Sequence, residues 1–187
     1  MRICDVPHIA LNKQENANAT RLGKSPKNRK WLERAYSPGV MEFLREKPTI
    51  CSGSTMGEQI ALEAYLRAMV NEWDETHIFM KGADQGFHNY LYYTNKLQNV
   101  RAIRSIRVFE QGKGIINNLG ALRKLKLSDL GLVNSNTREV YNWDGSLSPV
   151  VHQWDRDAEL FHYTESNVLP RYRREWSEYL QRSKALE

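Results

Sequence analysis

The segment from residue 47 to residue 73, KPTICSGSTMGEQIALEAYLRAMVNEW, constrains the fold more than any other part of the sequence. Residues 49–51 form a short apolar run typical of a buried strand, and Ser52-Gly53-Ser54 are the small residues typical of a turn. Thr55 and Glu58 have the spacing of a capping box, in which both side chains bond free N–H groups at the start of a helix. The segment therefore predicts a strand, a tight loop and a long helix.

The predicted helix has one apolar face. Its apolar residues recur at alternating spacings of three and one, as one side of a 3.6-residue period requires. They are Leu62, Tyr65, Leu66, Met69, Val70 and Trp73.

Two shorter helices are predicted on either side of this segment. Ser25 is a good N-cap and Pro26 suits a first turn, whereas Pro38-Gly39 ends the first of these helices. Asp84 is expected to cap the second of these helices, which is predicted to end near Lys96. Its inward-facing residues are Phe87, Tyr90 and Leu91.

The rest of the chain predicts strands followed by a closing helix. Residues 102–110 alternate apolar and polar side chains, residues 131–136 and 139–145 suggest short strands with turns, and residues 148–156 a brief strand. The closing helix within residues 165–187 places Tyr172, Trp176, Tyr179 and Leu180 on one side. With residues 1–24 expected to be irregular, the alternation of strands and helices predicts a single α/β domain over residues 1–187.

Composition limits the function classes only loosely. The net charge of +5 and the pI near 9.2 favour anionic partners without choosing among them. The Lys and Arg clusters are interrupted by acids and lie on different predicted elements, so no specific nucleic-acid binding is expected. No run of about 18 apolar residues is present and the start lacks the apolar centre of a signal peptide, so the chain as given is expected to be soluble and without a membrane span. Cys4 and Cys51 suggest neither a zinc site nor a disulfide framework.

Two stretches are candidates for binding a sugar or an anion. Ser52-Gly53-Ser54 either forms an ordinary connection or lets the backbone approach a ligand closely. Gly82-Ala83-Asp84-Gln85 brings a carboxylate beside an amide, which together accept from and donate to sugar hydroxyls. Asp84 serves equally well as a helix cap, and the two roles are compatible.

Two further stretches carry weaker signals. Lys113 and Gly114 belong to a glycine-rich loop that either faces an anion or is a plain surface loop. His152 follows an apolar pair in VVHQWDR and is suited to ligate a metal or contact a phosphate, although no second ligand lies near it in the sequence. Asp155 and Arg156 are expected to form a local ion pair.

The order of these motifs resembles the C-terminal half of a GT-A-type glycosyltransferase domain, from the nucleotide-diphospho-sugar transferases. The family pattern is an (N/C)SG loop leading into a helix, a DQ segment and a late histidine. Cys51-Ser52-Gly53, Asp84-Gln85 and His152 match it, and the resemblance covers roughly residues 14 to 156.

The resemblance implies a fold, a reaction and roles for the matching residues. The fold would be a partial, Rossmann-like GT-A fold with a mixed sheet flanked by helices, and the reaction would transfer a sugar from a nucleotide-sugar donor to a glycan or protein acceptor. Asp84 and Gln85 would be catalytic, whereas Ser52, Gly53, Ser54 and Gly82, together with Lys113 and Gly114, would bind substrate. His152 would complete a site for Mn²⁺ or Mg²⁺ or for the donor diphosphate.

One departure from the family pattern changes the expectation for activity. The family holds its metal with an Asp-x-Asp motif in the first half of the domain, and no such motif precedes Cys51. The chain is therefore expected to be a C-terminal fragment or a degenerate relative with weak or no activity alone, and a longer relative would be anchored in the membrane of the secretory pathway. The alternative is a basic, aromatic-rich module that binds nucleic acid or glycan without catalysis.

Overall fold

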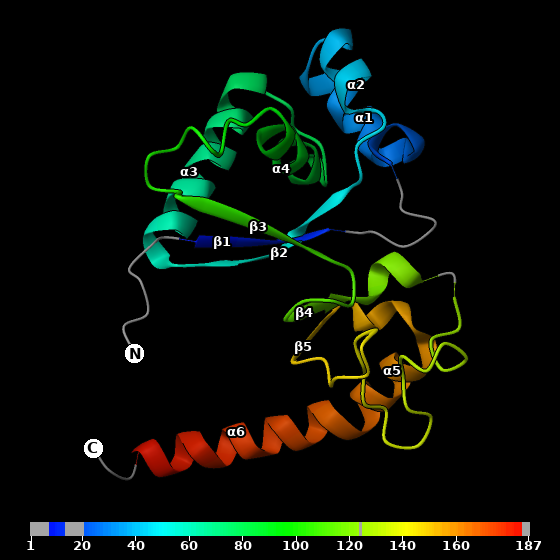
Figure 1. The fold of residues 1–187 in the computed structure, drawn as a ribbon. Helices are drawn as coiled ribbons and strands as arrows, with labels where there is room; N and C mark the ends of the chain where they lie inside the picture. The colour runs from blue at the N-terminus through cyan, green and yellow to red at the C-terminus, as the bar shows by residue number, and fades with distance from the viewer. Residues whose placement is uncertain (1–7, 14–20, 124, 185–187) are drawn as a thin grey trace, which may run out of the picture. The chain divides into compact units, whose positions relative to one another are not determined.

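The computed structural model describes residues 8–13, 21–123 and 125–184, and the chain divides into two compact units, Met1–Gly114 and Ile115–Glu187. The sequence predicts one domain. Both units combine strands with helices, so the fold is mixed α/β (Figure 1). No helix among these residues is long and apolar enough to cross a bilayer.

The first unit is built around a three-stranded sheet of order β2-β1-β3. Strand β1 (His8–Lys13) pairs antiparallel with β2 (Ile50–Gly57) and parallel with β3 (Ser105–Glu110). The strand predicted over residues 102–110 is thus confirmed, whereas β1 occupies a segment expected to be irregular. A six-residue strand has little periodicity of its own, and β1 is held by pairing with a partner on each side.

Four α-helices and the 3-10 helix η1 (Leu22–Lys24) complete the described part of this unit, and α3 and α4 cover one face of its sheet (Figure 1). The α-helices are α1 (Pro26–Ala35), α2 (Pro38–Leu44), α3 (Gln59–Thr76) and α4 (Ala83–Tyr93). The predicted cap of α1 is confirmed, because the Ser25 side chain accepts a hydrogen bond from the Asn28 N–H. Pro38 does end α1, but it also starts α2, which the sequence analysis missed. Proline suits a first helical turn as well as it stops a preceding helix.

The core of the first unit joins the sheet to α3 and α4 through Ile50, Ala61, Tyr65 and Leu91. Next to this core, Glu72 is buried and bound from both sides. Its carboxylate lies 2.5 Å from Lys96 Nζ and accepts a 2.8 Å hydrogen bond from the Tyr36 hydroxyl. Because a buried charge needs such partners, these contacts fix the orientation of α3.

The second unit has a small parallel pair of strands, β4 (Ile116–Asn118) and β5 (Val150–His152). Helices α5 (Ala158–Tyr163) and α6 (Leu169–Lys184) follow, joined by the π-helical turn η4 (Thr164–Val168). The predicted strand at β5 and the closing helix are confirmed. The strands expected at residues 131–136 and 139–145 are reduced to isolated bridges, such as Val133 with Val140.

Candidate functional site

The Ser52-Gly53-Ser54 stretch is a bulge within a strand and not the turn that its composition predicts. On β1, Leu11 pairs with Thr55 and the next residue, Asn12, pairs with Cys51. The three residues between Cys51 and Thr55 therefore lack pairing partners on β1 and protrude from the ladder. A bulge bends its strand and redirects its side chains, and bulges are common beside functional sites.

The start of α3 also differs from the prediction. The strand continues to Gly57, so Thr55 lies in β2 and cannot cap the helix. Glu58 is itself the N-cap residue and its side chain makes no cap hydrogen bond. The capping-box prediction is wrong because the strand pairing of β2 extends through the residues that the box would use.

Helix α4 is attached to the protruding strand by two side-chain amides. Gln85 Oε1 accepts a 3.0 Å hydrogen bond from the Ser52 N–H, and its Nε2 donates to the Ile50 carbonyl. Asn89, one turn further along, accepts from the Ile50 N–H at 2.8 Å and donates to the Ile50 carbonyl at 2.8 Å. Strand β2 is the outer strand of the sheet that the described residues form, and the two amides bond its free edge. Both ends of the Gln85 amide are occupied.

Asp84 is hydrogen-bonded to a residue of the bulge. The Ser52 hydroxyl donates a 2.7 Å hydrogen bond to Asp84 Oδ2, which joins two motifs separated by 32 residues in the sequence. Asp84 is exposed and lies in the first turn of α4, where a helix dipole favours a carboxylate. It is not the N-cap that the sequence analysis predicts, because that position belongs to Gly82.

Ser52, Gly53 and Asp84 line one groove of about 710 Å³ in the first unit. Its other lining residues are mostly apolar, and most of them come from one face of α3. They are Thr55, Leu62, Tyr65, Leu66, Met69, Val70, Trp73 and Phe87. The groove falls within the range of about 300–1,000 Å³ typical of sites for small ligands. It combines one polar corner with a long apolar wall.

A buried histidine contacts Tyr65, one of the residues that line the groove. His88 Nδ1 lies 2.8 Å from the hydroxyl of Tyr65, and His88 Nε2 is buried without a hydrogen-bond partner. Burial lowers the pKa of His88 to about 4, against an opposing effect of the Asp84 charge. Burial raises the pKa of Tyr65 to about 12. At neutral pH both groups are therefore uncharged, and Asp84 is the charged side chain among the residues that line the groove.

The other predicted residues of the first unit lie outside the groove. Ser54 is buried, and its hydroxyl has no hydrogen-bond partner. Gly82 has a φ of 85° and packs against the Trp31 ring, which lies 2.5 Å from where a β-carbon would be. Lys113 forms a 2.5 Å ion pair with Glu110, and Gly114 packs against Phe109.

His152 lies in the second unit, where it pairs in register with Asn118. Burial lowers its pKa, opposed by the nearby charge of Asp155, and its Nε2 atom is buried without a hydrogen-bond partner. Asp155 lies 3.6 Å from Arg156, which confirms the predicted ion pair. Across the described ranges no three His, Cys, Asp or Glu side chains cluster closely enough to hold a metal ion. A single imidazole does not fit Mn²⁺ or Mg²⁺, which need several oxygen ligands.

One residue that holds the bulge, Asn89, was missed in the sequence, and Trp73 was not assigned to the groove. Asn89 has the i, i+4 spacing from Gln85 that places both amides on one side of α4, and this spacing was a usable signal. Trp73 was placed correctly on one face of α3 with Leu66, and in the structure Leu66, Val70 and Trp73 are exposed along the groove. Tyr65 of the same face lies in the core. The hydropathy pattern predicts that a helix has an apolar face, but it does not show whether that face is covered by the core or lines a groove.

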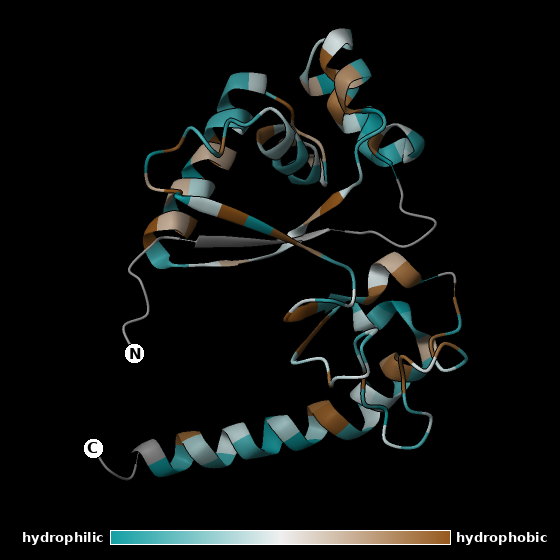
Figure 2. Cartoon of the chain, in the orientation of Figure 1, coloured by the Kyte–Doolittle hydropathy of each residue, from teal (hydrophilic) through white to brown (hydrophobic). Residues whose placement is uncertain are grey.

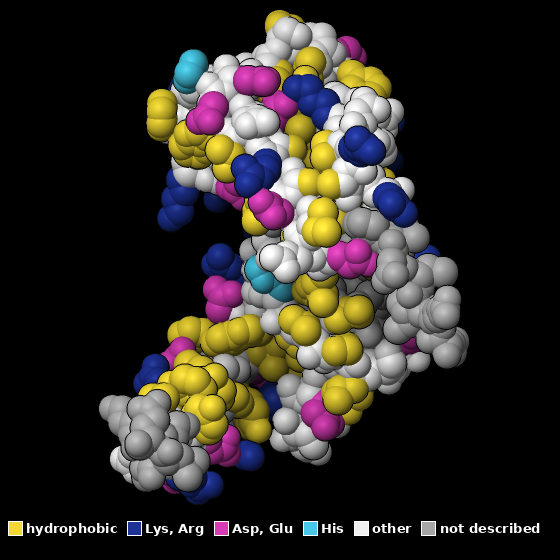
Figure 3. Space-filling model, turned by 90° about the vertical axis from the view of Figure 1, so that its left-hand side faces the viewer, with side chains coloured by type: hydrophobic (Ala, Val, Ile, Leu, Met, Phe, Trp, Pro, Cys, Tyr) yellow, Lys and Arg dark blue, Asp and Glu magenta, His cyan; other side chains and the backbone are white. Residues whose placement is uncertain are grey.

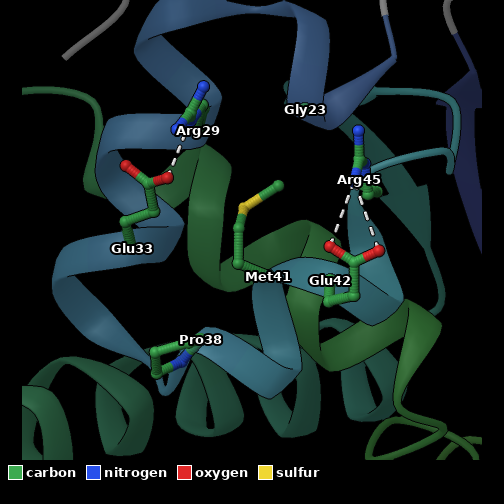
Figure 4. Close-up of a pocket in the computed structure, with 7 residues that line it drawn as sticks. All are labelled: Gly23, Arg29, Glu33, Pro38, Met41, Glu42 and Arg45. Carbon is green, nitrogen blue, oxygen red and sulfur yellow. Dashed lines mark hydrogen bonds and ion pairs between the residues drawn. The ribbon is translucent and has the colours of Figure 1, made fainter.

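A second pocket, of about 410 Å³, lies between α1 and α2 (Figure 4). Two ion pairs, Arg29 with Glu33 and Arg45 with Glu42, lie on opposite sides of it with Met41 between them. Because its charges are already paired, this pocket is a weaker site for a ligand than the groove.

Comparisons of the chain with models of protein families, with curated proteins and with solved structures found no match. The function must therefore be inferred from the groove itself.

Proposed function

We propose that the groove of the first unit binds the sugar of a nucleotide-sugar donor, and that the chain is a glycosyltransferase-like protein. The family reaction is the transfer of that sugar to a glycan or protein acceptor. The single observation that carries this proposal is the 2.7 Å hydrogen bond between Ser52 and Asp84. It joins the two motifs that the resemblance assigns to one sugar site.

The chemistry of the groove supports a sugar as its ligand. Asp84 has a second carboxylate oxygen that can accept from sugar hydroxyls, and charged acceptors make stronger hydrogen bonds than neutral ones. Trp73 is 37% exposed and forms part of the apolar wall, where its ring can stack on the apolar face of a sugar. The amide of Gln85 holds the bulge in place, so we assign it a positioning role and leave direct contact with the reacting sugar to Asp84.

We expect the chain alone to transfer sugar slowly or not at all. Departure of a nucleoside diphosphate requires stabilisation of the charge that develops on it, commonly by a metal ion or by fixed cations. Asp84, the charged residue of the groove, has the wrong sign for this task. No step of the proposal is therefore assigned to a metal ion.

Calorimetric titration with a panel of nucleoside-diphosphate sugars and the matching free sugars tests the proposal. We expect saturable binding that Asp84→Asn weakens at least about tenfold, because a charged hydrogen bond contributes about 1.5–3 kcal/mol. Asp74→Asn is the matched control, since Asp74 is exposed on α3 and does not line the groove. Equal effects of the two substitutions, or no binding of any sugar, would contradict the proposal.

The same titration separates the alternative of a glycan-binding module. Such a module would bind free sugars as well as nucleotide sugars, whereas a donor site prefers the nucleotide form. Binding of RNA that weakens steeply with salt would instead favour the nucleic-acid alternative.

A further inference from the structure

The groove of the first unit is lined mainly by apolar side chains, so its few polar atoms determine how a ligand can be oriented in it. Figure 2 shows hydrophobic residues recurring along α3, and Figure 3 shows hydrophobic side chains exposed among acidic and basic ones. Apart from the indole of Trp73, the polar side chains of the lining are those of Ser52, Thr55, Tyr65 and Asp84. The proposed sugar site uses Ser52 and Asp84, and it leaves Thr55 and Tyr65 without a role.

The hydroxyl oxygen of Thr55 is buried and has no hydrogen-bond partner among the residues that the structure describes. Buried polar atoms of this kind are few in folded proteins, and a water, an ion or a ligand commonly supplies the missing bond. Thr55 also lies close to the hydroxyl of Tyr65. Burial raises the pKa of Tyr65, the nearby Thr55 hydroxyl lowers it, and the charge of Asp84 raises it. Because such effects weaken with distance, the hydroxyl end of Tyr65 lies toward these two residues of the groove.

The protonation of His88 determines the direction in which the Tyr65 hydroxyl donates. His88 Nδ1 lies 2.8 Å from the Tyr65 oxygen, and within the described part of the chain its Nε2 atom is buried without a partner. If Nε2 carried the proton, a buried N–H group would have no acceptor, which is rarer in proteins than a buried acceptor without a donor. The proton therefore belongs on Nδ1, which donates to the Tyr65 oxygen. The O–H group of Tyr65 is then free to donate to another acceptor.

We propose that the Tyr65 hydroxyl donates a hydrogen bond to a hydroxyl oxygen of the sugar in the groove, and that His88 is the positioning residue that directs it there. Tyr65 supplies a neutral donor and Asp84 a charged acceptor, and a sugar hydroxyl needs both because it accepts and donates. In a purely structural pair the tyrosine would instead donate to the histidine. The inference rests on the proposed function, because it adds a specificity-determining residue to the same sugar site.

The first test needs no ligand, because it determines which ring nitrogen of His88 carries the proton. Long-range 1H–15N correlation spectra of the 15N-labelled full chain distinguish the two neutral forms of each histidine. We expect His88 to be protonated on Nδ1 at neutral pH. Tyr65→Phe assigns its signals, since it removes the hydrogen bond that Nδ1 makes. A proton on Nε2 would overturn the inference, because Tyr65 then donates to His88 and has no hydrogen left for a sugar.

The second test is calorimetric titration with the nucleoside-diphosphate sugars that the wild-type chain binds. Tyr65→Phe keeps the ring and should weaken binding about three- to tenfold, the effect of losing one neutral hydrogen bond. Tyr92→Phe is the matched control and should leave binding unchanged, because Tyr92 is partly buried on α4 and does not line the groove. Urea denaturation establishes that both variants are folded. Unchanged binding by Tyr65→Phe would contradict the inference.

Monodeoxy analogues of the bound sugar separate a direct contact from a change in the shape of the groove. We expect the analogue that lacks the contacted hydroxyl to bind equally to the wild-type chain and to Tyr65→Phe, whereas the other analogues keep the three- to tenfold difference. If Tyr65→Phe weakens every analogue by the same factor, Tyr65 only supports the groove and the inference is wrong.

The outcomes also separate this inference from the proposed function. If the wild-type chain binds no sugar, both are wrong. If Asp84→Asn weakens sugar binding at least about tenfold and Tyr65→Phe does not weaken it, the proposed sugar site stands and only the role of Tyr65 and His88 is wrong.

Discussion

Helices α3 and α4 both pack beside β2 and both bury apolar side chains, but α4 buries more polar side chains and α3 leaves large apolar ones exposed. Helix α4 buries His88 and Asn89 completely, whereas α3 leaves Leu66 and Val70 more than half exposed. The difference follows from hydrogen bonding. The polar residues of α4 have partners on the bulged strand or on Tyr65, and the apolar residues of α3 line a groove. Burial in this unit is decided by what each side chain contacts and not by hydropathy alone.

The largest effect is expected at Asn89, whose substitution tests whether hydrogen bonds to β2 explain the burial of polar side chains on α4. Replacing Asn89 with leucine leaves the N–H of Ile50 buried without its partner and removes two further hydrogen bonds, to the carbonyls of Ile50 and Gln85. We expect Asn89→Leu to lower the free energy of unfolding by about 4 kcal/mol, measured by urea denaturation. Asn71→Leu on the exposed side of α3 is the control and should change it by less than about 0.5 kcal/mol. Similar values for the two would show that the amide is not what holds α4 to β2.

The pH dependence of stability tests the burial of His88. Its folded pKa of about 4 lies below the ordinary value of 6.5, so the unfolded chain binds the extra proton first. Stability should therefore fall as the pH drops from about 6.5 to about 4, by up to about 3 kcal/mol from this residue, and level off below.

The variant His88→Asn should remove this part of the pH dependence, whereas His77→Asn, at an exposed position, should retain it. Urea denaturation at several pH values between 4 and 7.5 measures the slope. An unchanged slope in His88→Asn would mean that the imidazole is accessible to protons in the folded chain.

The sequence predicted the helices of this region better than its sheet. Helices α1, α3 and α4 were predicted because a 3.6-residue period is a local signal, although of the three predicted caps only that of Ser25 is confirmed. Strand β1 and the bulge at Ser52–Ser54 were not predicted, because pairing between β1 and β2 joins residues about 40 apart. Small residues in a row have the same composition in a turn and in a bulge.

The candidate site shows the same limit. Of the nine residues that the sequence assigned to one site, Ser52, Gly53, Asp84 and Gln85 lie together around the bulge. Four others of the first unit, Ser54, Gly82, Lys113 and Gly114, do not line the groove, and His152 belongs to the second unit. The sequence did not show that the Gln85 amide bonds the strand backbone. That contact depends on how far β2 protrudes from β1, which is a property of tertiary structure.

The role of Gln85 provides a smaller test of the comparison. Gln85→Met keeps the size of the side chain but removes its bonds to Ser52 and Ile50. We expect a loss of about 2 kcal/mol in the free energy of unfolding, because Asn89 still bonds Ile50. The adjacent Asp84→Asn should lose only about 0.3–1 kcal/mol, because an asparagine oxygen can still accept from Ser52 and only the interaction with the helix dipole is lost. If Asp84→Asn proves the more destabilising, the division between a positioning amide and a ligand-binding carboxylate is wrong.

The smallest expected effect concerns the apolar wall of the groove, and a matched pair of leucines measures it. Leu91 on α4 is 2% exposed and belongs to the core with Ile50 and Tyr65, whereas Leu66 on α3 is 58% exposed. Leu91→Ala should cost about 3–5 kcal/mol through the cavity that it leaves. Leu66→Ala should cost less than about 0.5 kcal/mol, because alanine favours the helix and the lost contacts are few. The small expected cost of Leu66→Ala reflects how little Leu66 contributes to folding. If Leu66→Ala lowers the free energy of unfolding about as much as Leu91→Ala, the wall of the groove is part of the core and not a surface that binds a ligand or a partner.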